Sequence, residues 1–82
     1  MSQYLILFRS LTWAQSSQRL LERAGITSQV VKAPQELTTE GCGYALSLFR
    51  RFEDAVSILK RNNRINGRIY RREENGDYVR LQ

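Results

Sequence analysis

Two short apolar runs, each followed by apolar residues at helical spacing, constrain the fold more than any other feature. The first run is Tyr4–Phe8 and the second is Tyr44–Phe49. Runs of this length are typical of buried strands, because buried helices usually extend over ten residues or more. In a chain of 82 residues this pattern predicts one domain built around one sheet.

The two helical stretches carry recognisable start and stop signals. Thr12 and Gln15 have the spacing of a capping box, and Gly25 is placed to end the first helix in a left-handed conformation. Glu53 and Asp54 suit the first turn of the second helix, where they complement its dipole. The expected buried stripes are Ala14, Ser17, Leu20, Leu21 and Ala24 in the first helix, and Phe52, Ala55, Val56 and Leu59 in the second.

Three further strands follow from alternation and turn signals. Ser28–Ala33 is one, stopped by Pro34, which has no amide hydrogen for a strand ladder. The alternating segment 65–70 is another, and Asn75-Gly76 predicts a type I′ turn that folds the last strand, 78–81, back onto it. Val79 and Leu81 are expected to point inward from that last strand.

The resulting order β-α-β-β-α-β, with a terminal hairpin, predicts an α+β protein of the split βαβ or ferredoxin-like pattern. We expect one domain over residues 1–82, with a core at about residues 4–70 and a basic hairpin arm at 71–82. The first and third strands should be central, and both helices should cover one sheet face. The other face should be open and bordered by Arg68, Tyr70, Arg72 and Arg80.

The chain is basic, with a formal net charge of +5 and a pI near 10.0. Residues 50–82 hold nine basic and five acidic side chains, so most of the excess lies there. Such a field attracts nucleic acid, acidic proteins or small anions, and a merely solvated surface is the alternative. The sequence shows neither a membrane-spanning apolar run nor a signal peptide, and a single cysteine indicates a reducing cytoplasm.

Cys42 is the candidate reactive residue, because it lies between Gly41 and Gly43 in a turn that leads into the third strand. The glycines clear side chains from both sides, and their amides would form a small nest for a thiolate or persulfide. Glu36 would hydrogen-bond the loop's amides, influence the thiol or simply carry a surface charge. A lone cysteine is otherwise most often a small buried apolar residue.

Several chemistries are excluded by composition. The chain has no histidine, so a Cys–His dyad cannot form, and no second cysteine for an internal disulfide or a Cys-x-x-Cys motif. One cysteine without histidine also argues against a zinc or iron–sulfur site within one chain. We therefore expect neither a bound metal nor a cofactor.

Several segments of the chain resemble the putative selenium/sulfur carrier-like family, first catalogued as a domain of unknown function. The resemblance covers about residues 4–70 and lies in the first apolar run, the end of the first helix and the order Pro34, Glu36, Leu37, Cys42, Gly43, Ala45 and Leu46. It implies a carrier that holds sulfur or selenium on Cys42 and exchanges it with donor and acceptor proteins. Such a protein would be a non-enzymatic carrier or accessory protein.

Two alternatives remain at this point. Gly43 to Phe49 partly matches the third-strand signature of RNA-recognition motifs, with Tyr44 and Phe8 as stacking platforms on the open face. Leu46 stands where that signature has a second aromatic residue, so RNA binding ranks second. The other alternative is a structural or interaction module with an unreactive cysteine, whose open face pairs with a second copy as a homodimer.

Overall fold

A computed structural model describes residues 3–37, 43–65 and 68–81. The described elements comprise five strands, two α-helices and a short 3-10 helix, η1. In chain order they are β1 (Gln3–Phe8), α1 (Leu11–Arg23), β2 (Gln29–Lys32), η1 (Gln35–Leu37), β3 (Tyr44–Leu48), α2 (Phe52–Arg61), β4 (Ile69–Arg72) and β5 (Tyr78–Arg80).

The strands form one antiparallel sheet in the order β2-β3-β1-β4-β5. Each helix connects two strands that are separated by a third, since β3 lies between β1 and β2, and β1 between β3 and β4. The α+β class and the inner positions of the first and third strands are thus confirmed. With β5 as a fifth strand at one edge, the sheet order differs from a plain four-stranded ferredoxin-like sheet.

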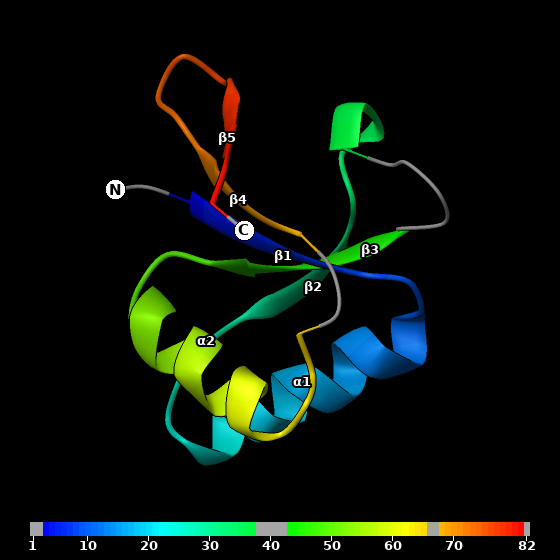
Figure 1. Cartoon of the computed structure of the whole chain (residues 1–82), viewed down its shortest axis with the longest axis vertical. Helices are drawn as coiled ribbons and strands as arrows, with labels where there is room; N and C mark the ends of the chain where they lie inside the picture. The colour runs from blue at the N-terminus through cyan, green and yellow to red at the C-terminus, as the bar shows by residue number, and fades with distance from the viewer. Residues whose placement is uncertain (1–2, 38–42, 66–67, 82) are drawn as a thin grey trace.

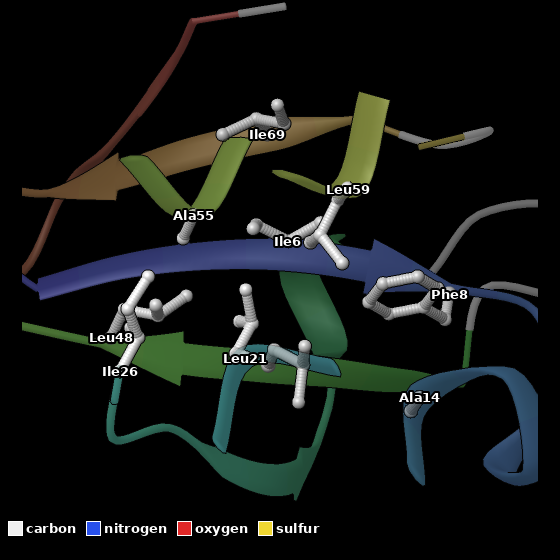
Figure 2. Close-up of a cluster of buried hydrophobic side chains, with 10 residues drawn as sticks. Ile6, Phe8, Ala14, Leu21, Ile26, Leu48, Ala55, Leu59 and Ile69 are labelled. Atoms are coloured by element: carbon white, nitrogen blue, oxygen red, sulfur yellow. The ribbon is translucent and has the colours of Figure 1, made fainter. Parts of the chain in front are cut away.

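The main core lies between the sheet and the two helices, which cover the same sheet face (Figure 1). Buried side chains of β1, β3 and β4 meet those of α1 and α2 (Figure 2). Full burial of one such aliphatic side chain contributes about 1.5–3 kcal/mol. This core consists of Ile6, Phe8, Ala14, Leu21, Ile26, Leu46, Leu48, Ala55, Leu59 and Ile69.

The opposite sheet face is covered, which corrects the expectation of an open face. Leu5, Leu7 and Ala45 point to that side and are at most 2% exposed. They form a second core with Leu37 of η1, Tyr70 and Ala33, against which Val31 and Tyr78 also pack. Figure 1 shows η1 on the side of the sheet away from α1 and α2. The segment after β2 therefore supplies a second apolar layer, which the strand pattern did not predict.

The N-terminal end of α1 differs from the expectation, and its C-terminal end agrees with it. Ser10, with extended φ and ψ, is the N-cap, and its Oγ accepts a hydrogen bond from the amide of Trp13 at 3.2 Å. The predicted start at Thr12 is wrong, because α1 already begins at Leu11 with Ser10 as its N-cap. Gly25 does end the helix, with φ of 78°, and the amides of Gly25 and Ile26 donate to Glu22 and Leu21. Ala24, expected to be buried, is exposed.

The C-terminal hairpin forms, but its turn is not type I′. That turn needs positive φ at two residues, whereas Gly76 has φ of 92° and Asn75 is not among the residues with positive φ. The amide of Gly76 instead donates to the carbonyl of Glu73 at 3.0 Å. Val79 and Leu81 are 37% and 41% exposed, so the inward orientation predicted for them is wrong.

Several strand boundaries also differ from the prediction by one or more residues. β3 ends at Leu48, and Phe49 is 52% exposed beyond it. β4 begins at Ile69, and Ile65 lies outside any strand.

Candidate functional site

The two central residues of the predicted site, Gly41 and Cys42, lie outside the described residues. The structure describes both ends of this segment, Leu37 and Gly43. What it establishes is therefore how the fold holds the two ends of the segment that carries the thiol.

At the downstream end, Gly43 extends the pairing of β2 with β3. The amide of Ala33 donates to the carbonyl oxygen of Gly43 at 3.1 Å, next to the paired residues Lys32 and Tyr44. The end of β2 and the start of β3 thus lie side by side in the sheet. Apart from its chain neighbours, no described heavy atom lies within 4 Å of the position that a Cβ on Gly43 would occupy. That the glycine leaves room for an adduct on Cys42 stays a prediction.

At the upstream end, η1 is fixed by burial and by hydrogen bonds. The amide of Leu37 donates to the carbonyl oxygen of Pro34 at 2.9 Å, and the Leu37 side chain is 6% exposed in the second core. Glu36, on the same short helix, is exposed.

Arg68 joins this upstream end to the sheet. Its Nη2 donates to the carbonyl oxygen of Leu37 at 3.1 Å, and its guanidinium lies 5.8 Å from the centroid of the Tyr70 ring. Its backbone is held as well, because its carbonyl oxygen accepts from the amide of Leu7 at 3.0 Å. Sequence reasoning placed Arg68 at the border of an open face and missed this role. The sequence contains one hint of this role. In the alternating segment 65–70, Arg68 is the neighbour of Ile69, which faces the helices, so its side chain belongs to the opposite sheet face.

Three basic residues, Arg9, Lys32 and Arg68, lie at the end of the sheet where this segment leaves and rejoins it. Lys32 is paired with Tyr44, which is also paired with Phe8, the residue directly before Arg9. Arg68 reaches the same end of the sheet through Leu37.

Tyr44 and Phe8 do not form a platform for RNA bases. The two residues are paired across β3 and β1, and both point to the helix side of the sheet. Phe8 is 2% exposed and belongs to the main core, and half-buried Tyr44 packs against that core. Base stacking needs aromatic rings exposed on the sheet surface, so this arrangement does not support the RNA alternative.

Within the described ranges, no group of three or more histidine, cysteine, aspartate or glutamate residues is placed to hold a metal ion. A search of the same residues finds no helix with the length and apolar character to cross a membrane.

Comparison with known families identifies the class of protein. Residues 3–71 match the family described as "Putative Se/S carrier protein-like". The match includes both cores, η1 and the Cys42 segment, and the chain belongs to this family, as its resemblance predicted. Residues 72–82, which hold β5, lie beyond the match. Neither a curated protein nor a solved structure was found to match the chain.

Proposed function

We propose that this protein carries sulfur or selenium on Cys42, as a persulfide or selenyl-sulfide, and passes it to a partner protein. Membership of the family, over a match that contains Cys42, is the observation that carries the proposal. The anchored ends of segment 38–42 support it, because a carrier thiol must be presented from a stable base.

Loading would proceed by exchange at one sulfur or selenium atom. The Cys42 thiolate attacks the outer sulfur of a donor persulfide, and a new S–S bond forms at Cys42. The donor's S–S bond breaks with its electron pair leaving on the donor thiolate, so no external oxidant or reductant is needed. A donor that carries selenium in the same place would give the selenyl-sulfide. Unloading repeats the step, with the acceptor as the attacking nucleophile.

The remaining predicted site residues have supporting roles in this proposal. Gly41 and Gly43 leave room for the adduct, and Glu36 and Tyr44 flank the segment on either side. The protein acts as a non-enzymatic carrier in the cytoplasm, where thiols stay reduced. Its fold is then best treated as a ferredoxin-like unit of β1–β4 and both helices, to which β5 is added.

The first test is whether Cys42 is accessible in the folded protein. Cys42 is the single cysteine, so any thiol label reports on it alone. We expect an alkylating reagent to modify the native protein at a rate close to that in denaturant. Modification that occurs only after unfolding would show a buried, inert cysteine and would contradict the proposal.

A further inference from the structure

Three arginines line a small hollow beside α1. Arg19 and Arg23 are exposed and lie one helical turn apart, and Arg64 reaches the hollow from the chain after α2. The hollow has a volume of about 160 Å³ and is completed by Ser16 and Leu20. Its lining contains three cationic side chains, one hydroxyl and no carboxylate.

Arg64 is held in place by its surroundings. Its guanidinium carbon lies 4.7 Å from the centroid of the Trp13 ring, in a cation–π contact. Its Nε is buried and has no hydrogen-bond partner among the described residues. The guanidinium is therefore oriented by stacking and packing.

The described acidic residues do not neutralise this cluster. The ion pairs Arg51–Asp54 and Arg71–Glu73 do not include a residue of the hollow. Cationic side chains that line one hollow without a carboxylate repel one another, and a bound anion relieves that repulsion. Guanidinium groups donate paired hydrogen bonds to planar or tetrahedral oxyanions, above all to phosphate.

We propose that Arg19, Arg23 and Arg64 form a binding site for a phosphate group. This site is independent of sulfur or selenium transfer and does not require a reactive Cys42. The phosphate group belongs either to a small phosphorylated ligand or to a nucleic-acid backbone, and both present the same oxygens to the arginines.

Trp13 provides the readout, because it is the single tryptophan and lies against Arg64. The full chain is titrated with inorganic phosphate at constant ionic strength, maintained with chloride, while tryptophan fluorescence and the NMR signals of the arginine Nε–H groups are followed. We expect a saturable change in at least one of the two. Linear drift in fluorescence together with unmoved arginine signals would overturn the proposal.

Variants separate a specific site from general charge attraction. Arg19→Gln and Arg23→Gln should each weaken phosphate binding about tenfold, the loss expected for one charge-assisted hydrogen bond. Arg50→Gln removes the same charge at a residue that lines a different hollow, and it should leave the affinity within about twofold. Equal weakening by Arg50→Gln would show that phosphate is attracted only by the net charge, and would overturn the proposal.

Competition with a short single-stranded oligonucleotide distinguishes the two sources of phosphate. Displacement of inorganic phosphate, with oligonucleotide binding weakened by Arg23→Gln, assigns the site to a nucleic-acid backbone. An oligonucleotide that does not displace phosphate assigns it to a small ligand.

Discussion

Arg68 donates a hydrogen bond from Nη2 to the carbonyl oxygen of Leu37 at 3.1 Å, which ties β4 to the last described residue before the Cys42 segment. The two residues are 31 positions apart in sequence. The same guanidinium lies near the Tyr70 ring, and the Leu37 side chain is buried in the second core. The fold thus fixes the base of the segment through one charged side chain and one apolar side chain.

Replacing Arg68 by alanine should destabilise the protein by about 1–3 kcal/mol, because a charge-assisted hydrogen bond to a partly buried carbonyl is lost. The midpoint and slope of urea unfolding measure this change. Arg72→Ala is the matched control, since it removes the same charge from an exposed residue of β4. A control that loses as much stability as Arg68→Ala would show that the hydrogen bond to Leu37 is unimportant.

Gly43→Ala and Gly25→Ala should have opposite effects on stability. A Cβ on Gly43 meets no described atom within 4 Å apart from its chain neighbours. Alanine should therefore raise the free energy of unfolding by about 0.4–1 kcal/mol, because it reduces the conformational entropy of the unfolded chain. Gly25 has φ of 78°, where alanine should cost about 1–2 kcal/mol. Thermal unfolding of both variants checks this. If the Gly43→Ala variant is instead destabilised, the backbone conformation at position 43 requires glycine.

Ser17→Ala should stabilise the protein by about 1 kcal/mol or more. Ser17 is fully buried in α1, and its Oγ has no hydrogen-bond partner among the described residues. Removal of an unsatisfied hydroxyl ends a desolvation penalty, and alanine is also the better helix former. Ser16→Ala, on the half-buried neighbour, should gain only about 0.5 kcal/mol from helix propensity. Equal gains in chemical denaturation would show that the buried hydroxyl is not penalised.

The main core could be predicted from the sequence because its elements are periodic. Ile6, Leu46 and Leu48 lie on continuous apolar strands, and Ala55 and Leu59 follow helical spacing. Which of these side chains are buried depends on the local spacing of apolar residues, and that spacing can be read from the sequence.

The second core could not be predicted in this way. Leu37 lies in a three-residue helix after a proline, where no period identifies a buried face. Its burial depends on contacts with residues far away in the chain, such as Leu7 and Tyr70. The same reason explains why the covered sheet face was expected to be open.

Turn and cap chemistry was predictable only in part. Gly25 and Asn75-Gly76 mark real chain reversals, but the hairpin turn is closed by a hydrogen bond between Gly76 and Glu73. Ser10 caps α1 ahead of Thr12, because both residues suit an N-cap and only the local backbone conformation decides between them. For the site, Cys42 and its glycines follow from residue type, whereas Arg68 becomes visible only through its contact with Leu37.

Intact-mass spectrometry after incubation with a persulfide donor tests the central claim most directly. We expect the wild-type protein to gain the mass of one sulfur atom, and a thiol reductant to remove it. Cys42→Ser, which leaves the chain without a thiol, should gain nothing. A wild-type protein that forms no adduct, or a Cys42→Ser variant that forms the same one, would contradict the assignment of Cys42 as a carrier thiol.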